Sequence, residues 1–307
     1  MKYKICKMHF STGLHIGNGL LSDGNPVFLA DTIFSALCHE ALNIENGISK
    51  LVKYFREGSL KISDGLPYIS EILYVPKPTT AIETENEGNS KEKKAFKKLK
   101  YVPVDKLCQF IKGNLDANKE KKILDTLGQY EMVQKASITY EAETVPYYVG
   151  IFQYQKNNGI YILIGYDSEE ALQYIMLLLK GLSYSGIGGK RKSGYGKFSI
   201  EYQELTSEFK KRMELSKYNE FITLSFSLPV EKELEEVCRN SDFQLIKRSG
   251  FVSSCDYADT FRKKKDFFGL SAGACVSNVY SGKIYDVSGK GNHPVYEYAI
   301  PLFMGVK

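Results

Sequence analysis

Residues 160–202, IYILIGYDSEEALQYIMLLLKGLSYSGIGGKRKSGYGKFSIEY, contain an extended apolar run, a helical run, a glycine-rich loop and a second extended run. Ser168 predicts the start of the helix, because its hydroxyl can accept a hydrogen bond from the first turn. Gly181 predicts the end of the helix, with Lys180 near its negative pole. The stretch therefore predicts a strand, a helix and a strand, with a glycine-rich loop over residues 182–198.

The segment before it, YYVGIFQYQKNNGIYILIGY (residues 147–166), predicts a β-hairpin. Its arms are apolar and aromatic, and Asn158 and Gly159 tolerate the positive φ angles of a tight turn. We therefore expect residues 147–154 to pair with residues 160–166.

Near the N-terminus, residues 3–10 predict a strand, and residues 11–25 form a loop rich in glycine. In the helix that follows, Asp31 is the expected cap, and it is better explained as a cap than as a metal ligand. The apolar side of this helix is formed by Ile33, Phe34, Leu37, Cys38, Ala41 and Leu42. A second helix is expected over residues 48–56.

Residues 1–203 thus give the order strand, helix, strand, strand, helix, strand. This is the order of a ferredoxin-like (RRM-like, βαββαβ) unit, and the fold class is α+β. Residues 83–128 are rich in Lys and Glu, so we expect a partly helical insertion there. Such a unit leaves one sheet face open, and many RNA-binding modules use that face.

Residues 204–307 predict a second, degenerate unit of the same kind. Residues 221–230 alternate as a strand, and residues 231–239 form a short amphipathic helix. Residues 243–254 resemble a hairpin that bends at Ser249 and Gly250, and residues 293–306 close the unit with a strand.

The composition excludes a disordered or fibrous protein. The chain has 307 residues and a net charge of +5, with 43% hydrophobic residues, which is typical of a globular protein. The basic residues are clustered, most densely in KEKKAFKKLK at residues 91–100. No signal peptide or membrane span is evident, and the cysteines lack zinc-ligand spacing. We expect a cytoplasmic protein with reduced cysteines and neither metal nor cofactor.

The glycine-rich loop predicts a phosphate-binding site. It follows a helix and precedes a strand, which argues against both a nucleotide-triphosphate loop and a dinucleotide-binding turn. The backbone amides of Gly186, Gly188 and Gly189 could face phosphate oxygens, while neighbouring side chains supply charge and a hydroxyl. These neighbours are Lys190, Arg191, Lys192 and Ser193. The expected ligand is the backbone of an RNA strand.

His15, in the sequence STGLHIGNG, is the second candidate. It could donate to a phosphate, stack on a base, act as a general acid or base, or make only a local hydrogen bond. No catalytic triad or carboxylate pair is evident in the sequence, so we expect no enzyme activity.

Three segments together resemble the RAMP (repeat-associated) superfamily of CRISPR proteins. They are STGLHIGNG leading into FLADTIFSALCHEAL, the segment YVPKP, and GIGGKRKSGYGKF before the closing strand. Within this superfamily the chain resembles the fourth subunit of the type III-A Csm effector complex.

The resemblance implies a non-catalytic subunit with two ferredoxin-like domains, residues 1–203 and 204–307. It implies binding of the 5′ repeat-derived tag of the CRISPR RNA (crRNA), with only an indirect relation to target RNA. The implied protein partners are the large palm-domain subunit and the backbone RAMP subunits. A hairpin called the thumb would separate tag from guide, and either residues 131–148 or part of residues 71–100 could supply it.

Carried onto this sequence, the resemblance implies a set of RNA-facing residues. These are His15, Gly17, Gly186, Gly188, Gly189, Lys190, Arg191, Lys192, Ser193 and Tyr195, followed by Lys77, Arg248, Phe251 and Arg262.

Two alternatives stay open from the sequence. A metal-independent endoribonuclease of the same superfamily would use His15 as general acid or base on precursor crRNA. A scaffold protein would instead direct its basic loops at acidic proteins.

Overall fold

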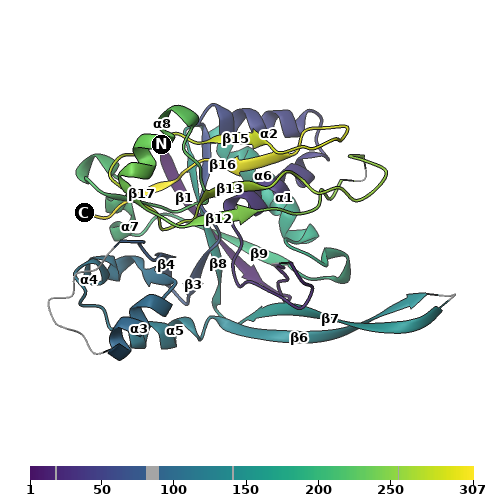
Figure 1. The fold of residues 1–307 in the computed structure, drawn as a ribbon, viewed down its shortest axis with the longest axis horizontal. Coiled ribbons are helices and arrows are strands. Elements are labelled where there is room, and N and C mark those ends of the chain that lie inside the picture. Colours follow the sequence, from purple (N-terminus) through teal and green to yellow (C-terminus); the bar gives the residue numbers. More distant parts are fainter. Residues whose placement is uncertain (18, 81–89, 140–141, 255) are drawn as a thin grey trace.

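The computed structural model describes the chain except for residues 18, 81–89, 140–141 and 255. Its centre is a seven-stranded sheet in the order β5-β4-β3-β8-β1-β9, in which β2 also pairs with β8 (Figure 1). The strands are β1 (Lys2–Phe10), β2 (Leu60–Ile62), β3 (Leu66–Ile69), β4 (Ile72–Pro76), β5 (Tyr101–Pro103), β8 (Asn158–Tyr166) and β9 (Phe198–Gln203).

Strands β1 and β8 form the middle of this sheet, with Cys6 opposite Ile162 in an antiparallel ladder. Every residue of β8 is buried, as its almost continuous apolar sequence requires. Alternate side chains of both strands enter two cores, because neighbours along a strand point to opposite faces. Cys6, Met8 and Ile162 belong to one core, and Ile5 and Tyr161 belong to the other.

Helices cover the first of these faces. They are α1 (Ala30–Ala41), α2 (Gly47–Arg56) and α6 (Glu169–Ser185). The predicted cap of α6 is confirmed, because the Ser168 hydroxyl accepts a hydrogen bond from the amide of Ala171 at 3.2 Å.

Two predicted helix ends are wrong. Gly181 lies inside α6, where its missing side chain leaves room for the carboxylate of Glu40 on α1, and α6 ends at Ser185 with Gly186 as the C-cap residue. The residue that precedes α1 is Leu29, and Asp31 lies in the first turn. The first amide of α1, from Ala30, donates instead to the carboxylate of Asp64 at 2.8 Å.

The predicted hairpin of residues 147–166 is also wrong. Strand β7 (Ala142–Tyr154) pairs with β6 (Gly128–Thr139), and both edges of β8 are taken by β1, β2 and β3. Residues 60–69 therefore provide the strand that the ferredoxin-like order assigned to residues 147–154. At the turn only Asn157 has a positive φ, of 67°, while Gly159 lies in β8 against the Met8 carbonyl and Tyr68.

Strands β6 and β7 form a long two-stranded hairpin that extends away from the sheet, and we call residues 128–154 the arm (Figure 1). Beside its base lies the inserted segment, which is partly helical over its described residues 90–128, as predicted. It contains α3 (Ser90–Lys98), the short helix η1 (Val104–Lys106), α4 (Leu107–Ile111) and α5 (Ala117–Leu124). Residues 83–89 of the predicted insertion lie outside the described residues.

The C-terminal third forms a four-stranded sheet, β11-β14-β10-β17, and two separate strand pairs, β12-β13 and β15-β16. Its strands are β10 (Phe221–Thr223), β11 (Ser241–Asp242), β12 (Leu245–Arg248), β13 (Phe267–Leu270), β14 (Cys275–Val276), β15 (Lys283–Asp286), β16 (Tyr296–Ala299) and β17 (Phe303–Gly305). Its helices are α7 (Ser207–Arg212), η3 (Leu215–Lys217) and α8 (Glu231–Arg239), and α8 matches the predicted helix. The predicted bend at Ser249 and Gly250 does not make a hairpin of residues 243–254, because β12 pairs with β13.

This third covers the sheet face that was expected to stay open. Ile5, Tyr161 and Leu163 of the central sheet pack with Phe209 and Met304 in one buried core. The prediction of an open RNA-binding sheet face is therefore wrong, since burying this apolar face stabilises the junction of the two parts of the chain. None of the described helices is long and apolar enough to cross a membrane.

Candidate RNA interface

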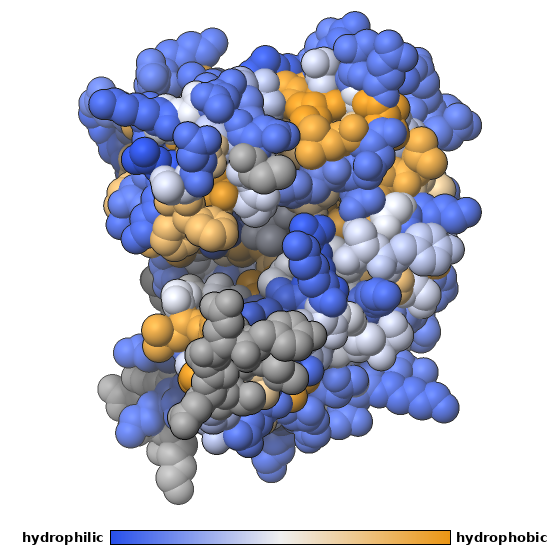
Figure 2. All heavy atoms as spheres, turned by 90° about the vertical axis from the view of Figure 1, so that its right-hand side faces the viewer, coloured by the Kyte–Doolittle hydropathy of each residue, from blue (hydrophilic) through white to orange (hydrophobic). Residues whose placement is uncertain are grey.

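A cleft of about 1300 Å³ lies where the two parts of the chain meet. One wall is formed by α1, the loop around His15 and the glycine-rich loop, and the other by residues 245–254 and 293–297. Figure 2 shows the side of the molecule toward which the arm extends, where hydrophilic residues cover most of the surface and hydrophobic ones gather in separate areas. A cleft between two parts of a chain is a common place for a ligand.

The cleft brings together half of the predicted RNA-facing residues. Those that line it are His15, Gly17, Gly188, Gly189, Arg191, Arg248 and Phe251. The others lie elsewhere, and these are Gly186, Lys190, Lys192, Ser193, Tyr195, Lys77 and Arg262.

The glycines of the loop allow a close approach between two segments. The amide of Gly189 donates to the carbonyl of His15 at 2.8 Å, and a Cβ atom on Gly189 would lie 2.6 Å from the His15 ring. The amide of Gly186 donates to Leu182 at 2.7 Å, and Gly188 has a φ of +90°. The amides of Gly186 and Gly189 are thus occupied within the protein and not free for phosphate.

His15 is nearly buried, with 5% of its surface exposed. Its Nδ1 lies 2.6 Å from the carbonyl oxygen of Gly150 in β7, so Nδ1–H donates and the ring is fixed against the base of the arm. This hydrogen bond reaches a residue 135 positions further along the chain, so it is not the local hydrogen bond that the sequence left open. Gly17 lies beside the same ring, 3.6 Å from Nε2 when measured from a Cβ built on the glycine.

The basic loop and the arm are joined by two cation–π contacts. Lys190 Nζ lies 4.7 Å from the ring centre of Tyr147, and Lys135 Nζ lies 5.1 Å from that of Tyr195. Such contacts contribute about 0.5–1 kcal/mol each at exposed sites. Lys135 and Tyr147 were not among the predicted RNA-facing residues, because no local sequence motif marks either one.

Charge in the glycine-rich loop is presented by side chains near the cleft. Residues 191–193 form the short helix η2, in which Lys192 and Ser193 are exposed and Arg191 is partly buried against the cleft. Burial and the positive charge of Arg191 lower the pKa of His39, the neighbouring residue on α1. His39 is therefore neutral at neutral pH, and Arg191 is the cation that faces this end of the cleft.

Arg248 lines the cleft and forms an ion pair with the nearly buried Asp31. Its Nε donates to Asp31 Oδ2 at 2.5 Å, and its Nη2 donates to Asp31 Oδ1 and to Thr32 Oγ1 at 3.1 Å each. Asp31 is thus the partner of an arginine from the C-terminal third and not the cap of α1. Bidentate pairing of this kind fixes the geometry of both side chains.

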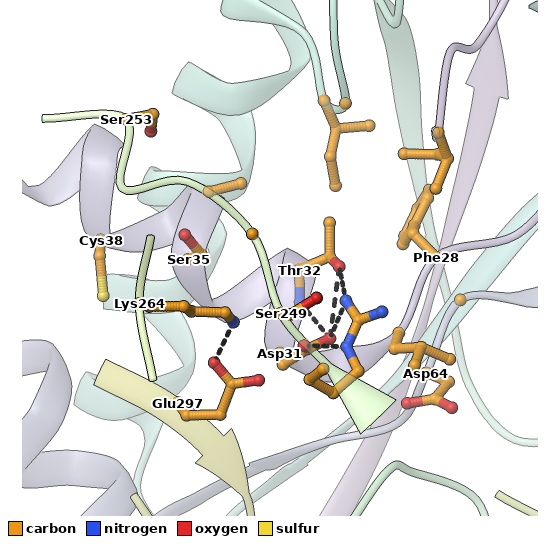
Figure 3. A pocket seen from close by; sticks show the side chains of 18 of the residues that line it. Phe28, Asp31, Thr32, Ser35, Cys38, Asp64, Ser249, Ser253, Lys264 and Glu297 are labelled. Carbon is orange, nitrogen blue, oxygen red and sulfur yellow. Dashed lines mark hydrogen bonds and ion pairs between the residues drawn. The ribbon is translucent and has the colours of Figure 1, made fainter. Parts of the chain in front are cut away.

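Two further carboxylates lie on the cleft floor, and sequence analysis gave no signal for either. Glu297 forms an ion pair with Lys264 (Figure 3). Burial of Glu297, together with the nearby negative charge of Asp31, raises the pKa of its carboxyl group. Burial raises the pKa of Asp64 to about 7, although the amides of Ala30 and Phe226 donate to it. Among the residues that the structure describes, no three His, Cys, Asp or Glu side chains form a metal-binding group.

Lys77 and Arg262 do not contribute to the cleft. Lys77 Nζ donates to the carbonyls of Phe96 and Lys97, so it stabilises the end of α3, and burial lowers its pKa. Arg262 is exposed, on the strand-like segment opposite Phe251.

Comparison with known proteins identifies the superfamily to which this chain belongs. A model of the RAMP superfamily matches residues 7–199, and a model described as the CRISPR Csm4 C-terminal domain matches residues 216–306. The chain is therefore a RAMP-superfamily protein.

Its relatives are more specific. The chain is 35% identical to the CRISPR system Cms protein Csm4 of Mycobacterium tuberculosis, over 95% of this chain and 94% of the relative. It is 28% identical to the Csm4 protein of Streptococcus thermophilus, over 99% of this chain and 98% of the relative. The chain belongs to the Csm4 family.

Solved structures share the fold at lower identity. A chain in the crystal structure of a Csm3–Csm4 subcomplex of the type III-A CRISPR–Cas interference complex matches with a TM-score of 0.68 at 18% identity, with all of both chains covered. A chain in the crystal structure of a Csm1–Csm4 cassette with pppApA matches with a TM-score of 0.62 at 18% identity, over 100% of this chain and 98% of that one.

Proposed function

We propose that the chain is a non-catalytic RNA-binding subunit of a type III-A CRISPR–Cas (Csm) interference complex in antiviral defence, where it anchors the 5′ tag of the crRNA. The observation that carries this proposal is the cleft, where the glycine-rich loop and the His15 loop meet the C-terminal third. Family membership supports the proposal, because the Csm4 relatives are CRISPR proteins.

Side chains, more than backbone amides, would hold the RNA backbone. Lys190, Arg191, Lys192 and Ser193 lie on one turn, of which Arg191 lines the cleft, and contacts of this type to phosphates read no sequence. His15 and Gly17 would act by holding the loop in position. Arg248 would act mainly through its ion pair with Asp31.

The arm is the candidate for the thumb that separates tag from guide. It contains residues 131–148, extends away from the sheet, and exposes Tyr130, Met132 and Tyr148 on one face. Aromatic side chains exposed on an extended hairpin can stack on bases.

Two protein partners follow from the comparisons. The matched structures contain Csm4 together with Csm3 and with Csm1, so this chain would bridge a backbone RAMP subunit and the large subunit. We further propose two ferredoxin-like domains, residues 1–203 and 204–307, and a cytoplasmic location.

The test is binding of the purified full chain to a single-stranded RNA that carries the 5′ tag, measured by fluorescence anisotropy at several salt concentrations. Replacing Lys190, Arg191 and Lys192 by Ala removes three charges, and the logarithmic salt slope should fall by about 2, because each phosphate contact to single-stranded RNA contributes about 0.7. A matched control replaces Lys119, Lys121 and Lys122 of α5, which are also exposed.

Equal losses of affinity in both triple variants would contradict the proposed interface. Cleavage of repeat RNA in EDTA that His15→Ala abolishes would make the chain an endoribonuclease. Crosslinking of the 182–198 loop to protein and never to RNA in the assembled complex would make it a scaffold.

A further inference from the structure

The loop that follows β12 presents two phenylalanines to solvent. Phe251 is 61% exposed and Phe261 is 87% exposed, and their rings lie 6.4 Å apart at an angle of 83°. Phenylalanine is usually buried, so an exposed pair in contact indicates a binding surface. We call residues 249–264, of which all but 255 are described, the aromatic loop.

The aromatic loop is held in place by its backbone and by two histidines. The amide of Val252 donates to Arg262 at 2.8 Å, and the amide of Lys264 donates to Gly250 at 2.9 Å. His39 of α1 lies 3.0 Å from the Ser253 hydroxyl, and His293 lies 2.8 Å from the Ser254 hydroxyl. The rings are therefore presented from a braced loop, so little conformational entropy is lost when a ligand binds.

Basic residues lie beside the rings, although the same loop also carries Asp256 and Asp259. Arg262, Lys263, Lys264 and Lys265 are consecutive, and Lys263 Nζ lies 5.4 Å from the ring centre of Phe251. Lys264 is neutralised by Glu297, which leaves Arg262 and Lys263 as exposed cations beside the rings. Exposed aromatic rings with cations beside them match the bases and phosphates of a single strand.

The aromatic loop also continues the cleft. Phe251 lines the cleft, and Ser253 on the same segment contacts His39. The positive charge of Arg191 helps to lower the pKa of His39. A strand whose phosphate lies at Arg191 could thus place the next exposed base near Phe251.

We propose that the aromatic loop is a base-stacking site for single-stranded RNA that emerges from the cleft, with bases on Phe251 and Phe261 and phosphates on Arg262 and Lys263. The inference rests on the proposed function, because it concerns the same RNA strand. It adds a contact surface that begins at Phe251 in the cleft lining and extends beyond the cleft to Phe261.

The test uses the full chain and a fluorescein-labelled single-stranded RNA of mixed sequence. Phe261→Ala should weaken binding about tenfold, because one stacked base is lost, and should leave the salt slope unchanged. Arg262→Gln should instead lower the slope by about 0.7. The matched control is Phe268→Ala in β13, an exposed phenylalanine with Lys247 Nζ 5.9 Å from its ring centre, which lies outside the cleft lining and should bind RNA like the original chain.

Photocrosslinking with iodouridine at successive positions gives a second measurement. We expect adducts on peptides that contain Phe251 or Phe261, at RNA positions beyond those that crosslink to residues 182–198. If Phe251→Ala and Phe261→Ala bind RNA like the Phe268→Ala control while the 182–198 loop still crosslinks, the stacking site is refuted and the proposed function stands. If the original chain binds no RNA, the proposed function is wrong, and the stacking site that rests on it is wrong as well. If both variants bind RNA normally but no longer assemble with the other subunits, the aromatic loop is a protein-docking surface and the inference is wrong.

Discussion

Replacing Arg248 by Gln tests whether this residue joins the two parts of the chain or contacts RNA. Its guanidinium makes three hydrogen bonds to α1, two of them to Asp31. The Asp31 side chain is only 3% exposed, while 28% of the Arg248 side chain reaches solvent. The substitution therefore leaves a nearly buried carboxylate without its partner.

The expected cost follows from this geometry. Removing one partner of a buried ion pair destabilises a protein by about 3–5 kcal/mol, because the remaining charge is not compensated. Partial exposure of Arg248 places the value at the lower end, at about 3 kcal/mol. With an m-value of about 3 kcal/mol per molar urea, the unfolding midpoint should fall by about 1 M.

The assay is urea unfolding of the original chain, Arg248→Gln, Asp31→Asn and the double variant. Both single variants should be destabilised, and the double variant should cost less than their sum by about 1–2 kcal/mol, since the two residues act as a pair. Arg239→Gln is the control, because its ion pair with Glu235 is exposed and should contribute less than about 0.5 kcal/mol. Unchanged unfolding of Arg248→Gln together with a reduced RNA salt slope would refute the ion-pair argument and make Arg248 an RNA contact.

Three other substitutions test particular features of the fold. Gly181→Ala should be neutral or stabilising by up to about 1 kcal/mol in thermal melting, because Gly181 lies inside α6. Only the flexible end of Glu40 lies near the new methyl group. A clear loss of stability would contradict this placement. Gly189→Ala should destabilise by about 1–3 kcal/mol, because the methyl group would displace the His15 ring, and a melting temperature equal to that of the original chain would disprove the tight contact. Asp64 has a pKa raised by burial to about 7, so its stabilising contribution is present at low pH and is lost as the pH rises through that value. From about pH 5 to about pH 8 the original chain should lose about 2–3 kcal/mol relative to Asp64→Asn, and parallel pH profiles would show that Asp64 does not titrate in this range.

Elements specified by local signals could be predicted from the sequence. The first strand, α6 with its Ser168 cap, α8 and the closing strand β9 were expected where the structure has them. In each case a periodic apolar pattern lies next to a capping residue or a turn within a few positions, so no distant contact is needed to define the element.

The pairing of β7 could not be predicted in this way. The turn sequence before β8 favours a local hairpin, but both edges of β8 are occupied by strands from residues 2–10 and 60–69. Burial of all nine residues of β8 requires neighbours on both edges, and β7 pairs with β6 instead. Long-range pairing of this kind overrides turn propensity because it buries more apolar surface.

The candidate site was predictable as chemistry and only partly as geometry. The glycine-rich loop and His15 were singled out separately, and the structure places them in contact. In the wall formed by residues 245–254, only Arg248 and Phe251 had been predicted to face RNA. The carboxylates of Asp64 and Glu297 in the same cleft had not been predicted. Residues from the two ends of a chain meet through the packing of whole units, which no local pattern encodes.

The structure also changes what the loop glycines contribute to RNA recognition. The amides of Gly186 and Gly189, which could have bound phosphate, are used within the protein, and Gly188 and Gly189 let the loop approach His15 closely. Under the proposed function, side-chain cations would supply the affinity for RNA, and their effect would depend on salt. A glycine substitution should consequently lower stability and RNA affinity together, whereas a lysine substitution in the same loop should lower the affinity and its salt slope while the melting temperature stays constant. Measuring the melting temperature and the salt slope of RNA binding for Gly189→Ala and Lys192→Ala separates these two contributions. If only Gly189→Ala lowers the salt slope, the backbone amides of the loop do bind phosphate and this argument is wrong.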